Sequence, residues 1–274
     1  MNQIGPTHSG KSLVFLKLGG SLITDKNTSR SPRLKVINRI AQEIADSLRE
    51  NPQLRIVLGH GSGSFGHMSG KKHSTREGVK TSQDWLGFAE VWHDASSLNR
   101  IIMDALRSVG IPTLAFPPSA AVTSQDREIT VWNLNPLQSA LGRGLVPVVF
   151  GDVVFDTVRG GTILSTEDLF VYLAVQLNPA RILLAGQDPG VWEDYPKCTS
   201  LLKEITSADL PSLQKIIRPS EAPDVTGGME EKVKIMLQLI NQFPNLETVI
   251  FSGEDPGTIQ SVLNGATIGT VLHS

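Results

Sequence analysis

The sequence predicts an α/β fold, an open three-layer αβα sandwich with a mostly parallel central sheet. Short apolar runs typical of buried strands alternate along the chain with segments in which apolar residues recur every three to four positions, as on one face of a helix. The first strand, helix and strand, at 13–18, 32–50 and 54–58, have the spacing of a βαβ unit. Such a unit implies parallel strands and a right-handed crossover, so helices should cover both faces of the sheet.

Glycine-rich turns are the third observation behind this prediction. They mostly follow predicted strands, at Gly19, Gly59, Gly151 and Gly186. The carboxyl ends of parallel strands meet at one edge of a sheet, where open α/β folds bind their ligands. We therefore expect these turns to lie together and to build one site.

Each further element is predicted from its own pattern. Pro32 suits the first turn of the helix at 32–50, and the helix at 82–109 carries apolar residues at helical spacing. Ser165, followed three residues later by Asp168, is a helix-start signature. The other expected elements are a strand at 111–116, a partly helical segment at 130–141, a strand at 145–150, a hairpin of 153–155 with 162–164, a helix at 165–177, a strand at 181–185, helices at 207–217 and 230–243, a strand at 248–252, a helix at 256–263 and a strand at 267–272.

Composition narrows the class of protein. The 274 residues are 40% hydrophobic and 19% charged, which is typical of a globular domain, so we expect one domain over 1–274 with a disordered leader at 1–11. The net charge of −2 and the lack of a long basic run argue against nucleic acid as a partner. No apolar run reaches the about 20 residues that span a bilayer, and the leader has no signal-peptide core. The single cysteine, Cys198, cannot form an internal disulfide, which suits the cytoplasm.

A glycine-rich loop at 59–67 is the main candidate for chemistry. It directly follows the strand at 54–58, contains four glycines and two serines, and has histidines at positions 60 and 67. Glycine lets backbone N–H groups approach an anion closely, and a histidine can donate to phosphate near neutral pH. The loop should therefore bind phosphate.

Two other phosphate motifs were weighed. The loop also fits the dinucleotide pattern G-x-G-x-x-G, but that fold needs a helix to begin there, whereas 68–82 is polar and basic and is expected to form a mobile loop. Residues 5–12 fit the Walker pattern G-x-x-x-x-G-K-[ST], yet only four residues precede them and a strand-like run follows. Both interpretations are therefore disfavoured.

Histidines raise a third alternative. His60, His67 and His73 could form a metal site, but the expected carboxylate or cysteine partners are missing from the nearby sequence. We therefore expect no protein metal site.

Five segments together resemble the amino acid kinase family. Each is weak alone, but their combination and order are specific and span most of the chain. The segments are Lys17-Leu18-Gly19-Gly20-Ser21, the glycine loop, Gly151-Asp152, the helix start at Ser165–Asp168, and Thr226-Gly227-Gly228-Met229 with Lys232. The resemblance implies a single domain whose N-terminal half holds the phosphoryl acceptor and whose C-terminal half holds ATP with Mg²⁺. It also implies a homodimer.

Within the family, the chain is most similar to the isopentenyl phosphate kinases. Lys26, in Ile23-Thr24-Asp25-Lys26, and His67, which closes the glycine loop, support this similarity. In that subfamily the matching lysine stabilises the transferring phosphoryl group and the matching histidine binds the acceptor phosphate. The implied activity is ATP-dependent phosphorylation of isopentenyl phosphate to isopentenyl diphosphate, in the isoprenoid (mevalonate) pathway. The same region is also similar to the fosfomycin kinases.

The resemblance assigns roles to individual residues. Lys17, Lys26 and His67 would contact the reacting phosphates, and Asp168 would orient the lysines while also capping its helix. The acceptor site would comprise Gly61, Ser62, His67 and Gly151, with Trp85 and Phe88 lining an apolar pocket. The nucleotide site would comprise Lys17, Gly19, Gly20, Ser21, Gly63, Asp188, Gly228 and Lys232.

Two positions depart from the family pattern. The turn Gly186-Gln187-Asp188-Pro189-Gly190 stands where Thr-Asp-Val-Asp-Gly is more usual, so the contacts to adenine and ribose need not follow the family. Ser62 replaces a frequent glycine of the phosphate loop.

The proposed acceptor determines what the reaction requires. A phosphate monoester has a second pKa of about 6, so it is mostly an anion at pH 7 and needs no general base.

Two alternative functions stay open. One is another kinase of the same fold, acting on fosfomycin, a carboxylate, a carbamate or a nucleotide. A non-catalytic nucleotide-binding protein is another, against which Lys17, Lys26, Asp168 and Lys232 argue.

Overall fold

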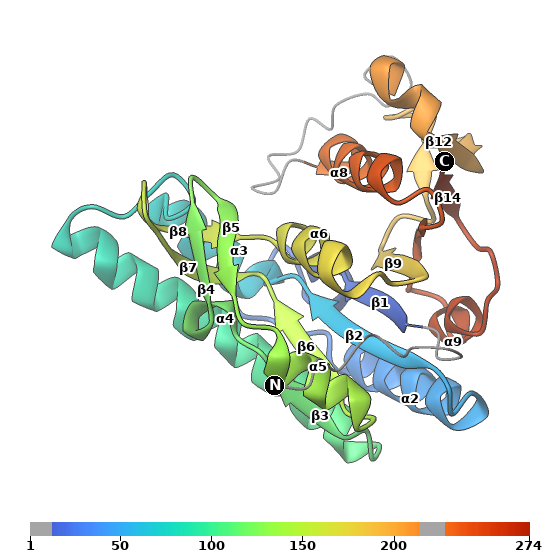
Figure 1. The fold of residues 1–274 in the computed structure, drawn as a ribbon, viewed down its shortest axis with the longest axis horizontal. Coiled ribbons are helices and arrows are strands. Elements are labelled where there is room, and N and C mark those ends of the chain that lie inside the picture. The colour runs from blue at the N-terminus through green and yellow to red at the C-terminus, as the bar shows by residue number, and fades with distance from the viewer. Residues whose placement is uncertain (1–12, 214–227) are drawn as a thin grey trace, which may run out of the picture.

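The computed structural model describes residues 13–213 and 228–274, and its centre is an eight-stranded sheet (Figure 1). All pairings in this sheet are parallel except that of β13 with β14, so the predicted mostly parallel sheet is confirmed. From edge to edge the strands are β12 (Glu204–Thr206), β14 (Thr270–His273), β13 (Glu247–Ser252), β9 (Arg181–Gly186), β1 (Leu13–Leu18), β2 (Arg55–His60), β6 (Val146–Phe150) and β3 (Thr113–Ala115).

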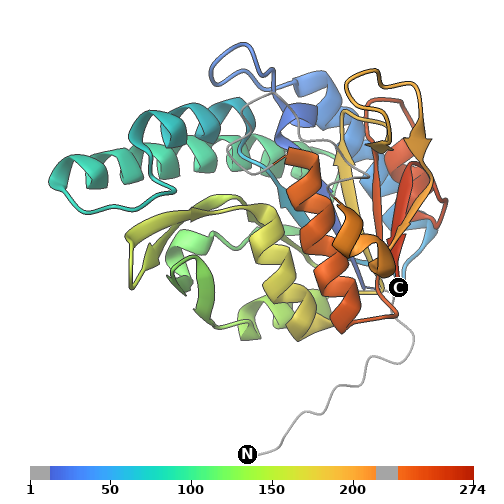
Figure 2. The ribbon, with the colours of Figure 1, turned by 90° about the horizontal axis from the view of Figure 1, so that it is seen from above.

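Helices cover both faces of this sheet and complete the three predicted layers (Figure 1). Helices α2 (Leu34–Glu50), α4 (Ser82–Ser108) and α9 (Thr258–Leu263) share one core. Helices α5 (Asn135–Gly142), α6 (Thr166–Leu177) and α8 (Gly228–Gln242) share the other, and Figure 2 shows α6 beside α8. Side chains alternate along a strand, so β1 sends Leu16 and Leu18 into the first core and Phe15 into the second.

A smaller sheet extends beside α4 (Figure 1). Its order is β5 (Glu128–Trp132), β4 (Val122–Gln125), β7 (Asp152–Asp156) and β8 (Gly160–Leu164). The β7–β8 hairpin confirms the one predicted from sequence. The segment 130–141 is helical only from Asn135, because Thr130 to Trp132 belong to β5. The remaining elements are α1 (Gly20–Ile23), α3 (Gly63–His73), β10 (Val191–Trp192), β11 (Leu201–Leu202) and the 3₁₀ turns η1 (Pro118–Ala120) and η2 (Ser207–Ser212).

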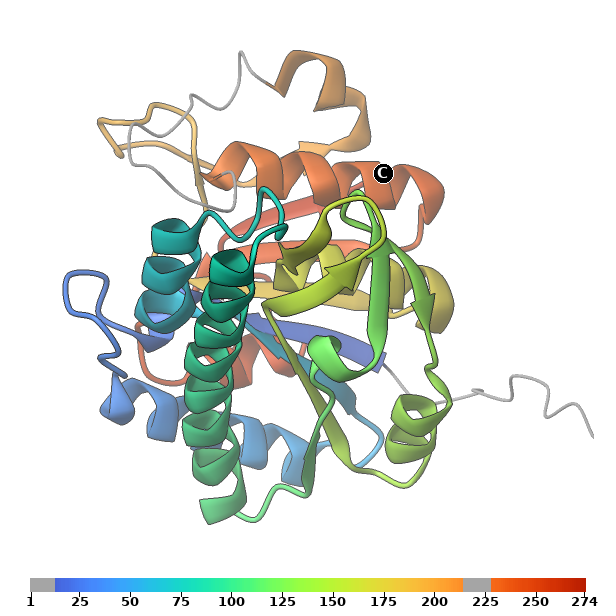
Figure 3. The same ribbon diagram turned by 90° about the vertical axis from the view of Figure 1, so that its left-hand side faces the viewer.

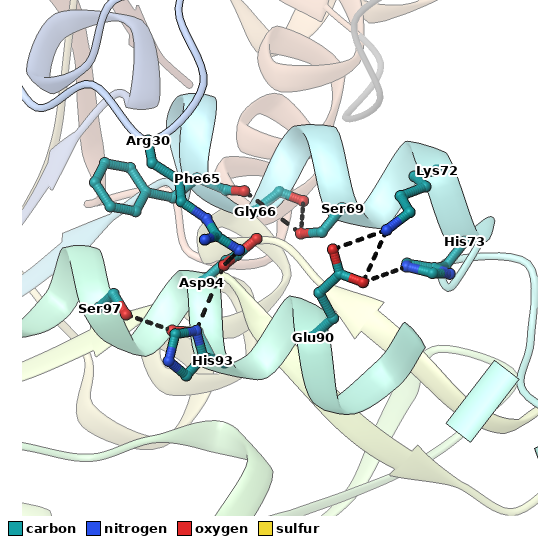
Figure 4. Close-up of polar contacts among 10 residues, drawn as sticks. All are labelled: Arg30, Phe65, Gly66, Ser69, Lys72, His73, Glu90, His93, Asp94 and Ser97. Atoms are coloured by element: carbon teal, nitrogen blue, oxygen red, sulfur yellow. Dashed lines mark hydrogen bonds and ion pairs between the residues drawn. The ribbon is translucent and has the colours of Figure 1, made fainter. Parts of the chain in front are cut away.

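The predicted mobile loop at 68–82 is wrong in its first part, because α3 runs on to His73 and lies along α4 (Figure 3). Glycine is a poor helix former, so tertiary packing decides here. A Cβ added at Gly66 would touch Cβ of Ala95 in α4, at 3.9 Å. Nε2 of His73 lies 2.7 Å from Oε2 of Glu90, also in α4 (Figure 4). A helix therefore does begin in this loop, at Gly63, so the prediction that no helix follows the G-x-G-x-x-G pattern is wrong.

Several predictions lie outside the described residues. They are the leader at 1–11, the Walker pattern at 5–12, the end of the helix at 207–217, and Thr226 and Gly227. No helix in the described ranges is both long and apolar enough to cross a membrane.

Candidate active site

The glycine turns meet at the carboxyl edge of the large sheet, as predicted. The N–H of Gly19 donates to the carbonyl of Ala185 at 2.8 Å, and that of Gly61 donates to Leu18 at 3.0 Å. The N–H of Gly151 donates to the carbonyl of His60 at 3.1 Å. Each turn is therefore hydrogen-bonded to the end of a neighbouring strand, and the turns after β1, β2, β6 and β9 form one surface.

The turn after β1 and the glycine loop touch through their backbones. A Cβ added at Gly20 would lie 2.6 Å from the amide nitrogen of Gly63, which is too close for any residue with a side chain. Gly63 itself has φ +48°, a conformation that favours glycine. Oγ1 of Thr24 accepts a hydrogen bond from the N–H of Ser64 at 2.9 Å. The glycines at both positions are thus required for the close approach of the two phosphate-binding candidates.

Lys17 forms a buried ion pair with Glu167, Nζ to Oε1. Lys17 shares its face of β1 with Phe15, so it points toward α6, and Glu167 lies in the first turn of that helix. Burial favours the neutral form of Glu167, but the charges of Lys17 and Lys232 outweigh it and lower the pKa of this carboxyl. The pair is therefore charged at neutral pH, with Lys232 as a second cation nearby.

The carboxylate beside Lys17 was predicted to be Asp168, but the structure gives this position to Glu167. Asp168 closes a capping box with Ser165: the Ser165 N–H donates to Oδ2 of Asp168 at 2.8 Å, and the Asp168 N–H donates to Oγ of Ser165 at 3.1 Å. Its Oδ2 also lies 3.7 Å from Nη2 of Arg127. Successive residues of a helix differ by about 100° in direction, so Glu167 points to Lys17 while Asp168 points to the cap.

The acceptor residues predicted from sequence come together in one pocket. Gly61, Ser62, His67 and Gly151 line it, together with Arg76 and the start of α6 at Ser165, Thr166 and Glu167. The rest of the lining is apolar or lacks a side chain: Gly66, Gly70, Val91, Ile163 and Leu164. The pocket thus combines the groups predicted to bind phosphate with an uncharged wall.

Trp85 and Phe88 do not line this pocket, contrary to the prediction. Their rings lie 5.2 Å apart and pack with Phe155 of β7, at 5.8 and 5.4 Å. Phe88 also fills the space over Gly161, where an added Cβ would lie 2.8 Å from its ring. Val91, one turn further along α4 and in the same apolar cluster as Phe88, lines the pocket instead, because the pocket lies beside that turn of the helix.

A second pocket adjoins the first. Both are lined by Arg76, Ser165 and Glu167, and the second adds Gly228 and Lys232 from the start of α8. Its remaining lining residues are Arg127, Asp168, Glu231 and Ile235. Glu167 therefore lies where the predicted acceptor and nucleotide residues meet.

Other predicted nucleotide residues lie along the same edge. Gly19, Gly20 and Ser21 form the end of β1 and the start of α1, and Asp188 is exposed in the turn after β9.

Lys26 is exposed in the segment between α1 and α2 and does not line either pocket. That segment is tied to α3 and α4. The N–H of Arg30 donates to the carbonyl of Ser64 at 3.2 Å, and Nη2 of Arg30 lies 2.7 Å from Oδ1 of the buried Asp94 (Figure 4). The segment that carries Lys26 is therefore held beside the glycine loop.

Among the described residues, no cluster of three or more His, Cys, Asp or Glu suited to a metal is found, and the three histidines lie in different surroundings. His60 is fully buried and its ring stacks on Phe150. Its Nε2 lies 3.1 Å from Oδ1 of Asn99. Burial lowers its pKa to about 4, so the ring is neutral at pH 7. His73 contacts Glu90 in α4 instead.

Open α/β sheets bind their ligands at the carboxyl edge, and glycine-rich turns with a lysine are the groups that phosphotransferases place on phosphates, so the site suits a phosphotransferase. Comparison with known proteins agrees. Residues 12–252 match the amino acid kinase family, and the chain belongs to this family. This membership also decides against the dinucleotide interpretation.

Relatives within the family are named isopentenyl phosphate kinases. The protein of that name from Methanocaldococcus jannaschii is 32% identical over 95% of this chain and 98% of its own length. That from Methanothermobacter thermautotrophicus is 33% identical over 93% of this chain and 97% of its own. A crystal structure of isopentenyl phosphate kinase superposes with a TM-score of 0.81 at 29% identity, over 95% of this chain and 99% of the other.

Proposed function

We propose that this protein transfers the γ-phosphoryl group of ATP to isopentenyl phosphate, giving isopentenyl diphosphate and ADP in isoprenoid biosynthesis. The observation behind this is the pocket in which His67 and three residues of the glycine turns share a lining with Val91 and Ile163. Such a lining suits a phosphate that carries a short apolar tail. The names of the relatives support the same substrate.

The chemistry asks the protein for positioning and charge neutralisation. An oxygen of the acceptor phosphate attacks the γ-phosphorus, a new P–O bond forms, and the bond to the bridging oxygen breaks as ADP leaves. Because the acceptor is already an anion, no proton needs to be removed. Lys17 and Lys26 would contact the transferring oxygens, and Glu167 would hold Lys17 in place. His67 would donate to the acceptor phosphate, supported by Gly61, Ser62 and Gly151.

The nucleotide would lie over the C-terminal half of the domain, with the acceptor over the N-terminal half. Its phosphates would contact Lys232 and the backbone at Gly19, Gly20, Ser21, Gly63 and Gly228, and Asp188 would lie toward the nucleoside. The carboxylate of Glu167 pairs with Lys17, and that of Asp168 caps its helix. Mg²⁺ would therefore be bound mainly by ATP phosphates and water rather than by these two side chains. Bound Mg²⁺ would neutralise phosphate charge. A cytoplasmic homodimer remains part of this proposal.

The test is an ADP-release assay with Mg²⁺-ATP and isopentenyl phosphate, run beside fosfomycin, UMP and acetylglutamate. We expect selective turnover of isopentenyl phosphate, with isopentenyl diphosphate identified by mass spectrometry. Turnover of one of the other acceptors instead would support the assignment as a kinase but contradict isopentenyl phosphate as its substrate. ATP binding without turnover of any acceptor would favour a non-catalytic nucleotide-binding protein.

A further inference from the structure

Two arginines stand where the two pockets meet, and the proposed function does not yet use them. Arg76 lies in the connection between α3 and α4 and lines both pockets. Arg127 lies in the turn between β4 and β5 and lines the second, with Lys232. Neither residue was predicted from the sequence to belong to the site. They come from parts of the chain about 50 residues apart, so only the fold brings them together.

Arg127 occupies a backbone position that favours glycine. The β4–β5 connection is a two-residue turn in which Asp126 has φ +50° and Arg127 has φ +73°. Hairpin turns with two positive φ angles prefer Asn-Gly or Asp-Gly, because a side chain at the second position strains the backbone. The carboxylate of Asp156 holds the turn by accepting the N–H groups of Asp126 at 3.0 Å and Arg127 at 2.8 Å. A strained arginine in a turn that glycine would serve better indicates a use for its guanidinium.

The backbone of Arg76 is held by a hydrogen bond, whereas part of its side chain has no partner. Oγ1 of Thr162, buried in β8, donates to the Arg76 carbonyl at 2.8 Å. In the described ranges, Nη1 of Arg76 and Nε of Arg127 are buried and have no hydrogen-bond partner. Burial, and then the charge of Arg127, lower the pKa of Arg76, although the guanidinium keeps its proton at pH 7. Carboxylates already lie near both cations: Oδ2 of Asp168 is 3.7 Å from Nη2 of Arg127, and the charges of Asp168 and Glu167 act on Arg76. The buried donors that they leave unpaired suit a further anion between or beside the two guanidinium groups.

We propose that Arg76 and Arg127 bind phosphate oxygens at the junction of the two pockets. Arg76 contacts the acceptor phosphate as it receives the phosphoryl group, because it lines the pocket that holds His67. Arg127 contacts the donor phosphates, because it shares the second pocket with Lys232. The ligand class is a phosphate monoester or polyphosphate, so this inference rests on the proposed function and adds two residues to it.

Arg127→Gly gives the sharpest test, because glycine relieves the backbone strain while the guanidinium is removed. An arginine that serves only its contact with Asp168 would give a variant with unchanged kinetics. We expect equal or higher stability together with a kcat/KM for ATP lowered by at least about tenfold, the usual effect of losing a charged hydrogen bond. The matched control is Asp126→Gly, which changes the neighbouring residue of the same turn and should keep wild-type kinetics.

Arg76→Gln should raise the KM for the acceptor by at least about tenfold, and Arg76→Lys should recover part of this loss because it keeps the charge without the planar fork. Arg159→Gln is the control, because Arg159 forms an ion pair with Asp126 on the neighbouring turn and lines neither pocket. Wild-type kinetics in both Arg127→Gly and Arg76→Gln would overturn the proposal.

Calorimetric titration with inorganic pyrophosphate separates this inference from the proposed function. Pyrophosphate needs neither ATP turnover nor an isoprenoid acceptor. We expect binding to the wild type that weakens at least about tenfold in both arginine variants and is unchanged in both controls. Equal binding in all five proteins would reject the two-arginine site even if isopentenyl phosphate is turned over. Weakened binding without that turnover would keep the site and reject the substrate.

Discussion

Nζ of Lys17 and Oε1 of Glu167 form a buried ion pair between residues 150 positions apart in the sequence. Strand β1 supplies the cation and the first turn of α6 supplies the anion, so the pair joins the centre of the sheet to the helix layer above it. Two buried charges are stable only when they stay together, because removing one leaves the other desolvated and uncompensated. The position of the Lys17 ammonium therefore depends on Glu167.

Glu167→Gln should lower kcat far more than Asp168→Asn does. Loss of the carboxylate frees the Lys17 ammonium to move, and a displacement of about 1 Å in a reacting group costs on the order of 100-fold in rate. Asp168→Asn affects mainly the helix cap, which is worth about 1 kcal/mol of stability. Steady-state kinetics and urea unfolding of both variants measure the two effects. A larger kcat loss in Asp168→Asn would return the lysine-orienting role to Asp168.

His67→Ala should reduce kcat/KM for isopentenyl phosphate roughly thirtyfold, because a hydrogen bond to a charged phosphate, worth about 2 kcal/mol of transition-state stabilisation, is lost. His67→Gln keeps a donor without a charge and should lose less. His93→Ala serves as control, because His93 is exposed on α4 and lines neither pocket. Full activity of His67→Ala would remove this residue from the acceptor site.

Val91→Ala should widen the apolar wall of the acceptor pocket. We expect the ratio of kcat/KM for geranyl phosphate to that for isopentenyl phosphate to rise, because the longer tail gains room where a side chain is truncated. The KM for ATP should not change. Trp85→Ala is the comparison, since Trp85 packs with Phe88 and Phe155 away from the pocket. If Trp85→Ala shifts the ratio and Val91→Ala does not, the original assignment of the aromatic residues is correct.

Gly59→Ala should destabilise the fold although it changes a single methyl group. The added Cβ would lie 2.5 Å from Cγ2 of Thr166 and 2.6 Å from Cζ of Phe170, where β2 meets α6. Overpacking of this kind costs about 1–3 kcal/mol, measurable as a shift in the urea unfolding midpoint. Gly142→Ala at the end of α5 meets nothing within 4 Å and should leave stability unchanged or slightly higher. Equal stability of the two variants would contradict this packing.

Asp152 should make stability depend on pH in a direction opposite to that of most carboxylates. Burial raises its pKa to about 6, although the N–H groups of Ser119 and Val153 donate to it. Between the unfolded pKa of about 4 and the folded value, the native state binds more protons than the unfolded chain, so the contribution of this group to stability falls as pH rises. The difference amounts to about 3 kcal/mol once pH exceeds the folded value.

Asp152→Asn removes this titration. Because other carboxylates titrate in the same range, the quantity to measure is the free energy of unfolding of the variant minus that of the wild type. This difference should increase from pH 4 to pH 7. A difference that stays constant across the range would mean that Asp152 ionises normally.

Much of the fold and part of the site could be predicted from the sequence. The alternation of strands and helices, the mostly parallel sheet and the meeting of the glycine turns follow from local patterns, because periodicity and turn residues act over a few positions. Gly61, Ser62 and Gly151 converge because they follow the carboxyl ends of β2 and β6, and His67 joins them from α3, which begins directly after the turn. The order of the family motifs along the chain was enough to indicate the family.

Tertiary structure alone decided the rest. Helix α3 forms from a glycine-rich segment because α4 packs against it, a contact that no local propensity records. The choice of Glu167 over Asp168 depends on how α6 is rotated about its axis, because neighbouring residues of a helix point about 100° apart. The choice of Val91 over Trp85 and Phe88 depends on which turn of α4 lies beside the pocket. Arg76 and Arg127 meet only because the small sheet folds back toward α6. Sequence patterns identify which elements form, whereas packing determines which of their side chains reach the site.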